Sequence, residues 1–125
     1  MRKLLTGLDG NGRSCLVEGD EIAIEQVMRE GLKVSRLHET SDVVAGLARW
    51  DLSAWEPGVS TGMHTTDTVD YEMILAGSGE LTLEDGVHPF EEGDVIVMTG
   101  VLHAWKAGPD GFLMSVITIP APRPA

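Results

Sequence analysis

Two acidic side chains in the middle of the sequence lie in an unexpectedly apolar stretch. Asp70 and Glu72 stand two positions apart in the run Asp-Tyr-Glu-Met-Ile-Leu-Ala, residues 70–76, which is otherwise apolar. Residues two apart on a strand face the same side and lie about 6 to 7 Å from each other, so the two carboxyl groups share a face. An ionised carboxylate without a partner costs several kcal/mol in an apolar interior, so this spacing predicts a cation or a water-filled pocket beside them.

Short strands are the elements that must position these acids. Fifteen glycines and six prolines divide the 125 residues into short periodic runs, which favours an all-β fold. The predicted strands are 14–18, 32–38, 45–54, 62–66, 70–76, 79–84, 94–98, 103–107 and 112–119. Their even spacing, with turn signals between them, is typical of a sandwich or a closed barrel.

The two ends of the chain are less regular. In the segment 20–31, Asp20 could cap a helix that ends at Gly31, whereas Ile22 and Ile24 fall on alternate positions as in a strand. Both interpretations remain open. The proline-rich residues 120–125 are expected to form a frayed tail.

A first motif surrounds the acids. Gly58, His64 and Gly77 match the first signature of the cupin superfamily, which reads Gly, five residues, His-x-His, three or four residues, Glu, six residues, Gly. Thr66 stands where the second histidine of that signature would be, and Asp70 stands where its glutamate would be.

A second motif follows about thirty residues later. Gly93 and His103 match the second cupin signature, Thr99 stands at its proline position, and Ala107 stands at its asparagine position; the spacing to His103 is one residue short. The chain therefore resembles a small single-domain cupin with a degenerate metal motif. The resemblance implies one domain over residues 1–125, a jelly-roll β-barrel of two antiparallel sheets, with 1–40 as N-terminal strands or an arm.

The resemblance also implies a divalent metal ion, such as Fe, Mn, Zn or Ni, in the barrel mouth. Its ligands would be His64, Asp70 and His103, which approximate the two-histidine, one-carboxylate set that leaves open positions on an octahedral ion. Because Asp70 is one methylene shorter than glutamate, Glu72 could ligate instead or act as a base. Thr66 could hold a metal-bound water and line the substrate pocket.

Further pocket residues follow from alternation. Trp105 shares the face of His103, and Met114 lies on a strand beside the motif strands, so both are candidates for the substrate pocket. Arg49 shares its alternation set with Asp51 and Ser53, which favours a solvent face, although a cupin strand at this point can offer an arginine to a substrate carboxylate.

These residues favour an enzyme that acts on an oxygenated small molecule. The metal would serve as a Lewis acid while Glu72 or Asp70 moves a proton, which fits decarboxylation, dehydration or isomerisation. An Fe(II)-dependent dioxygenase is an alternative, since the same ligands leave room for O₂. A third possibility is a metal-free binding or sensor cupin, in which His64, Asp70 and His103 form a hydrogen-bonded cluster.

The composition of the chain limits the kinds of partner that it is expected to bind. A formal net charge of −11 would repel nucleic acid and anionic membrane surfaces, so neither is an expected partner. The one cysteine, Cys15, cannot form an intramolecular disulfide, and neither a secretory signal nor a membrane span is evident. We therefore expect a cytoplasmic protein. His38 and His88 stand beside acidic or turn residues and are expected to be solvated.

A homodimer is also expected. Tyr71, Met73 and Leu75 make the opposite face of the strand with the acids apolar as well, and such a face needs a cover. The N-terminal segment or a second subunit could supply that cover.

Overall fold

The computed structural model describes residues 2–21, 27–29, 31–39 and 48–121. Within these ranges all regular structure is β-strand. The strands are β1 (Leu5–Leu8), β2 (Ser14–Glu18), β3 (Val27–Arg29), β4 (Leu32–Glu39), β5 (Arg49–Trp55), β6 (Thr68–Leu83), β7 (Gly86–Glu91), β8 (Val95–Met98) and β9 (Ala104–Pro120). The all-β prediction is therefore confirmed. The described residues include no helix that is long and apolar enough to cross a membrane.

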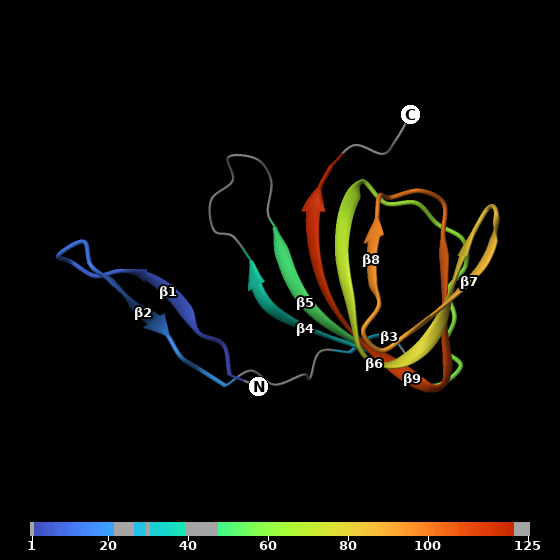
Figure 1. Ribbon diagram of the computed structural model, residues 1–125, viewed down its shortest axis with the longest axis horizontal. Coiled ribbons are helices and arrows are strands. Elements are labelled where there is room, and N and C mark those ends of the chain that lie inside the picture. Colours follow the sequence, from blue (N-terminus) through green and yellow to red (C-terminus); the bar gives the residue numbers. More distant parts are fainter. Residues whose placement is uncertain (1, 22–26, 30, 40–47, 122–125) are drawn as a thin grey trace.

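The strands β3 to β9 curl into a barrel (Figure 1). They form one antiparallel sheet in the order β3-β4-β5-β9-β6-β7, and β8 pairs with β6. The expected two sheets are thus continuous with each other. The reason is that β6 and β9 are long, pair along most of their length and bend at two register irregularities, so each strand serves both walls.

Several strand boundaries in the structure differ from those predicted from the sequence. The predicted strands 70–76 and 79–84 are parts of β6, and the strands 103–107 and 112–119 fall almost entirely in β9. The prediction of a strand at 62–66 is wrong, because within that segment only His64 forms an isolated bridge.

Other segments extend the sequence-based picture. Strands β1 and β7 were not predicted, since neither shows a clear alternation. In the ambiguous segment 20–31, residues 27–29 form a strand, and residues 22–26 and 30 lie outside the described residues. Residues 45–47 of the predicted strand 45–54 and residues 122–125 of the predicted tail also lie outside them. Strand β9 continues through Pro120, which pairs with Thr68.

The barrel interior is filled at one end by aromatic side chains. Trp55 and Phe112 stack with their ring centroids 5.1 Å apart, and Phe90 meets the edges of Phe112 and Trp105 at 5.1 and 5.7 Å. All four rings are buried. This packing closes one end of the barrel and leaves the polar groups at the other.

The hairpin of β1 and β2, here called the N-terminal hairpin, is a sheet of its own that extends away from the barrel (Figure 1). On the outside of the barrel, Tyr71 and Met73 are each 48% exposed, as the alternation predicted for that face. The assignment of residues 1–125 to one domain, with 1–40 as strands and arm, stays a prediction.

Gly77, which matches the last glycine of the first motif, lies where β6 passes closest to β9. Its φ is +79°, a region that favours glycine, and a Cβ there would collide with the backbone carbonyl oxygen of Gly111. Gly77→Ala should therefore lower the free energy of unfolding by at least about 2 kcal/mol, measured by denaturant titration. Gly10→Ala is the matched control, since nothing lies within 4 Å of a Cβ there and its φ is ordinary. Equal stability of the two variants would contradict this role for Gly77.

Candidate functional site

Two histidines are paired by their own backbones. His64, in the connection between β5 and β6, and His103, just before β9, exchange two N–H···O=C bonds of 2.9 Å in an isolated antiparallel bridge. This pairing holds the imidazole rings side by side, with centroids 4.2 Å apart. His103 is 3% exposed, whereas His64 is open to solvent. The structure thus brings together the predicted nitrogen ligands from segments about forty residues apart.

Both rings are oriented in the same way. Nδ1 of His64 donates to the carbonyl of Gly62 at 2.9 Å, and Nδ1 of His103 donates to the carbonyl of Val101 at 2.6 Å. A carbonyl oxygen only accepts, so each Nδ1 carries a proton, and in the neutral form of either ring the lone pair is on Nε2. Among the described residues no hydrogen bond occupies either Nε2. The two lone pairs are therefore available to a metal ion or a proton.

Burial lowers the pKa of His103, and the neighbouring His64 acts in the same direction. The hydrogen bond to Val101 and the charge of Asp70 oppose this decrease. His103 is consequently neutral near pH 7, which is the form that ligates metals or accepts a proton.

Glu72 faces the barrel interior in a row of cross-strand neighbours. In this row Arg36, Asp51, Val116, Glu72 and Ile96 lie side by side on β4, β5, β9, β6 and β8. Val116 belongs to the buried core, so the row points inward. The predicted placement of an acid on an inward face of this strand agrees with this register.

Burial raises the pKa of Glu72 to about 9, and the nearby Asp70 carboxylate adds to the effect. Glu72 is 4% exposed, and its Oε1 has no hydrogen-bond partner within the described part of the chain. Near pH 7 this side chain is therefore a neutral carboxylic acid with an unsatisfied oxygen inside the barrel. Such a group is a ready proton donor.

Asp70 lies in the next inward row, between Met98 of β8 and Thr118 of β9. Burial raises its pKa, but a 2.9 Å hydrogen bond from Thr68 Oγ1 lowers it, as do the charge of His103, a hydrogen bond with Thr118 and the charge of Arg49. Burial prevails and the pKa of Asp70 is raised overall, but its hydrogen bonds and the opposite charges favour the ionised form, whereas burial and the charge of Asp70 both favour the neutral form of Glu72. The environments therefore separate the two acids into a base and an acid.

The four predicted metal ligands are only partly assembled. The histidine pair fits a divalent ion, because both Nε2 atoms are free and their tautomer is set by backbone carbonyls. In the described ranges, however, no group of three or more His, Cys, Asp or Glu side chains lies close enough to hold a metal. These residues thus fit a two-histidine site whose other positions would come from water, substrate or a carboxylate that moves.

The predicted pocket residues separate into two kinds. Trp105 and Met114 are 6% and 5% exposed and belong to the packed core, although the ring of Trp105 meets the edge of His103 with centroids 6.0 Å apart. Trp105 also lines a cavity of about 480 Å³ next to His64. Thr66 is half-buried, and its hydroxyl lies 3.2 Å from Thr68 Oγ1, whose one proton goes to Asp70, so Thr66 is the donor in this pair. Trp105 thus lies beside the histidine pair, whereas Met114 lies deeper in the barrel.

Arg49 belongs to the inward row of Asp70, next to Thr118. The expectation of a solvent face for its alternation set is wrong for Asp51 and Ser53, which are 8% and 6% exposed. The reason is that Asp51 and Ser53 lie beside the core residues Val116 and Met114 of β9, in rows that face the barrel interior. Arg49 itself is exposed at the rim of the barrel.

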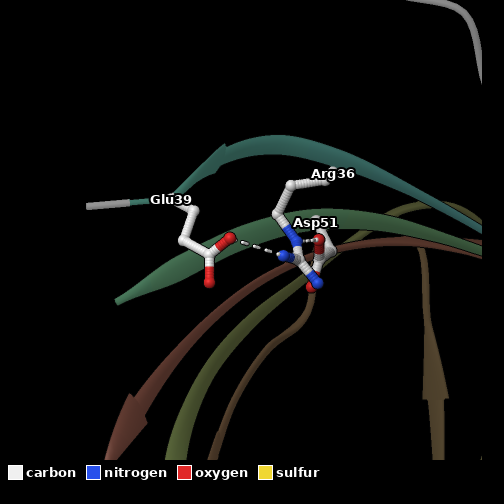
Figure 2. A network of polar contacts seen from close by, with 3 residues as sticks. All are labelled: Arg36, Glu39 and Asp51. Carbon is white, nitrogen blue, oxygen red and sulfur yellow. Dashed lines mark hydrogen bonds and ion pairs between the residues drawn. The ribbon is translucent and has the colours of Figure 1, made fainter. Parts of the chain in front are cut away.

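A second cation was missed by the sequence reasoning. Figure 2 shows Arg36 of β4 between two acids: its Nε donates to Asp51 Oδ1 at 2.5 Å and its Nη1 donates to Glu39 Oε2 at 3.1 Å. Asp51 accounts for most of the increase in the pKa of Arg36. The sequence did contain a signal for this pair: Asp51 is a charged residue in a largely apolar strand, and the preceding strand carries an arginine that could lie opposite it.

No protein-family model matches the chain. Two curated proteins of Diaporthe leptostromiformis, the phomopsin biosynthesis cluster proteins C' and D, are each 37% identical to it over 51 residues. This match takes in 40% of the chain and 27% of each relative, so the chain spans well under two thirds of their length.

Solved structures resemble the whole barrel. The Schizosaccharomyces pombe Cnp3 cupin domain has a TM-score of 0.68 at 12% identity and covers 95% of this chain and 87% of its own. Ectoine synthase from P. lautus has a TM-score of 0.65 at 16% identity, with 81% and 72% covered. The polyketide cyclase RemF from Streptomyces resistomycificus has a TM-score of 0.62 at 22% identity, with 84% and 76% covered. At these identities the likeness shows the fold alone.

The protonated state of Glu72 predicts a pH dependence of stability. A carboxyl group whose pKa rises from 4.5 to about 9 on folding binds a proton in the native state that the unfolded state has lost. Its contribution is complete below about pH 4.5 and decreases as the pH rises to about 9. Each pKa unit corresponds to about 1.4 kcal/mol, so the loss is on the order of a few kcal/mol.

Glu72→Gln removes this titration and should flatten the decrease in unfolding free energy between pH 5 and pH 9, measured by denaturant titration at each pH. Glu80→Gln, an exposed position on the same strand, is the control and should keep the wild-type slope. An unchanged slope in Glu72→Gln would mean that Glu72 is ionised in the folded protein.

Proposed function

The chain has the cupin β-barrel fold, and on that premise we propose that it is an enzyme of the lyase or isomerase type acting on an oxygenated small molecule. The observation that carries the proposal is the buried carboxylic acid of Glu72, whose Oε1 has no hydrogen-bond partner among the described residues, beside the hydrogen-bonded Asp70. Fold neighbours that include an ectoine synthase and a polyketide cyclase support an enzyme of small molecules.

In this proposal Asp70 and Glu72 divide the proton transfers. Asp70 removes a proton from the carbon adjacent to the one that bears the leaving or migrating oxygen, and in a dehydration the electron pair of that C–H bond forms the new C=C bond. Glu72 gives its proton to that oxygen, so in a dehydration the C–O bond breaks and water leaves. The proton on Asp70 then passes to Glu72 through water and restores both groups. A general acid and a general base typically contribute about 10² to 10⁴-fold each.

His64 and His103 would hold a divalent ion through their Nε2 atoms. When bound, such an ion supplies Lewis-acid polarisation of a carbonyl or hydroxyl oxygen. The chain's own contribution there is to orient both imidazoles, through the hydrogen bonds from Nδ1 to the carbonyls of Gly62 and Val101, so that each Nε2 is left for the ion.

Arg49 supports a substrate that carries an anionic group. The guanidinium of Arg36 is already paired with Asp51 and Glu39, whereas Arg49 has no ion pair among the described residues and lies in the row of Asp70. A carboxylate on the substrate would pair with Arg49 at the rim and direct the reacting carbon toward the acids.

A second candidate is a metal-free small-molecule-binding protein. The incomplete ligand set within the described ranges favours it. Metal content separates the two candidates, because only the first needs the lone pairs of both histidines.

For the metal, we expect the purified chain to bind Mn²⁺, Ni²⁺ or Zn²⁺ with one site per chain by isothermal titration calorimetry. His64→Ala and His103→Ala should each weaken binding at least about tenfold while far-UV circular dichroism stays unchanged. His88→Ala, an exposed histidine paired with Asp85, is the control. Equal affinity in the double variant at positions 64 and 103 would exclude the pair as the site.

For the reaction, incubation with a panel of hydroxy and oxo carboxylic acids in D₂O should give deuterium incorporation or product by NMR. Glu72→Gln should keep metal affinity and reduce turnover at least about 10²-fold. Asp70→Asn should reduce deuterium incorporation at least about 10²-fold. Turnover that survives in both variants would contradict the acid–base assignment. Consumption of O₂ with the same panel would instead indicate the dioxygenase alternative.

A further inference from the structure

One of the three tryptophans has an indole N–H without an acceptor. Trp50 Nε1 donates to Ser115 Oγ at 2.8 Å, and Trp55 Nε1 donates to Ser53 Oγ at 2.9 Å. Trp105 is 6% exposed, yet within the described part of the chain its Nε1–H has no hydrogen-bond partner. Because a buried indole N–H usually finds an acceptor, Trp105 keeps the capacity to donate to a bound ligand.

Trp105 lines the cavity of about 480 Å³ beside His64, here called the tryptophan cavity. The lining comes from the end of β5, the connection that follows it and the start of β9: Trp55, Thr61, Gly62, Met63, His64 and Trp105. The cavity thus combines two indole rings and a thioether with one imidazole. Its volume lies in the range of small-molecule sites and can hold a six-membered ring with short substituents.

Gly62 keeps this cavity open. A Cβ at position 62 would meet no atom within 4 Å, and the backbone there does not have the positive φ that favours glycine. Neither a close approach of two backbones nor a turn conformation therefore requires glycine at this position. Its physical effect is to leave empty the space that a larger side chain would take beside the two indoles.

The lining favours a flat aromatic ligand. Trp55 already stacks on Phe112 with ring centroids 5.1 Å apart, and Phe90 meets the edge of Trp105 at 5.7 Å. An aromatic ring in the cavity would extend this cluster through contacts of the same kind. Met63 is 43% exposed, and its flexible thioether can pack against such a ring.

Few polar groups remain available around the cavity. Thr61 Oγ1 accepts from the backbone N–H of Trp105 at 3.0 Å, and Nδ1 of His64 donates to a backbone carbonyl. The indole N–H of Trp105, the hydroxyl proton of Thr61 and Nε2 of His64 are left. A sugar would find partners for few of its hydroxyls there, whereas one oxygen on an aromatic ring is sufficient to satisfy Trp105.

We propose that the tryptophan cavity binds an aromatic ring of the substrate and that Trp105 Nε1 donates to a hydroxyl or carbonyl oxygen on that ring. The inference rests on the proposed function, because it names the substrate class of the same site: an aromatic hydroxy or oxo acid. Since His64 lines the cavity, a ring held there brings its substituents next to the histidine pair. Trp105 and Gly62 are then specificity-determining residues.

The first test compares three acids by isothermal titration calorimetry without added metal ion: para-hydroxyphenyllactate, phenyllactate and lactate. The first should bind at least about tenfold more tightly than lactate, which lacks the ring. It should bind about threefold to tenfold more tightly than phenyllactate, which lacks the ring oxygen. Equal affinity for the three acids, or binding of none, would overturn the proposal.

Gly62→Leu fills the cavity and should weaken the binding of para-hydroxyphenyllactate at least about tenfold. The matched control is Gly10→Leu in the turn of the N-terminal hairpin, where a Cβ also meets nothing within 4 Å; it should bind as the wild type does. Far-UV circular dichroism should stay unchanged in both variants. Unchanged affinity in Gly62→Leu would mean that the acid binds outside the cavity.

The hydrogen bond from Trp105 has its own test. Trp105→Phe removes the N–H and should lower the affinity for para-hydroxyphenyllactate to that for phenyllactate. In the proton–nitrogen correlation NMR spectrum of the wild type, para-hydroxyphenyllactate should shift the indole resonance of Trp105. The resonance of Trp50, on the outer side of the barrel, should stay in place. An unshifted Trp105 resonance in the bound protein would contradict the hydrogen bond.

These outcomes separate the cavity from the reaction, because binding is measured without metal and without turnover. If the aromatic acids bind in the cavity and no acid of the panel turns over, the proposed reaction is wrong and the cavity assignment stands. If short aliphatic acids turn over equally well in the wild type and in Gly62→Leu, the reaction stands and the cavity assignment is overturned.

Discussion

The antiparallel pairing of β6 with β9 is the interaction on which the barrel depends. These two strands contribute to both walls, and β5, β7 and β8 are all attached to one or the other of them. The pairing continues past two irregularities because Gly77, which has a positive φ, and Gly79 have no Cβ that would collide with the β9 backbone at Gly111 and Lys106. The bend directs residues 70 and 72 into the interior next to the connections that carry the histidines. A straight pair of strands would present the same side chains on a flat, open sheet.

The interior that results is divided between apolar packing and polar groups. Four aromatic rings pack together, and the polar groups beside them are two carboxyl groups, two imidazoles and the ion pair of buried Asp51 with exposed Arg36. Each polar group avoids the cost of burial in its own way. Arg36 neutralises Asp51, backbone carbonyls orient both imidazoles, threonines hold Asp70, and Glu72 keeps its proton. Glu72 is the group with an unsatisfied oxygen, which makes it the point where a ligand would gain most by binding.

The outside of the barrel has the opposite problem, because it exposes apolar side chains to water. A strand that is apolar on both faces, as β6 is around Tyr71 and Met73, suits a wall that is covered on both sides. The N-terminal hairpin is the element that the chain has available for such a cover. The inward carboxyl groups of residues 70 and 72 and the exposed apolar side chains of residues 71 and 73 therefore come from alternate positions of one strand.

The sequence alone determined the class of fold, the alternation of 70–76, and the segments that carry His64 and His103, because turn residues, period-two patterns and local motifs are properties of short stretches. It did not determine that 70–76 and 79–84 form one strand, since a bent strand and two strands joined by a glycine turn have the same local pattern. Nor did it place Asp51 inside, in an ion pair with the exposed Arg36. Burial on β5 depends on β4 and β9 lying on either side of it, and the register between strands far apart in the chain decides which charges meet. The tertiary structure likewise decided that the two imidazoles face each other while the carboxylates stay apart from them, because only the closure of the barrel sets distances between side chains on different strands.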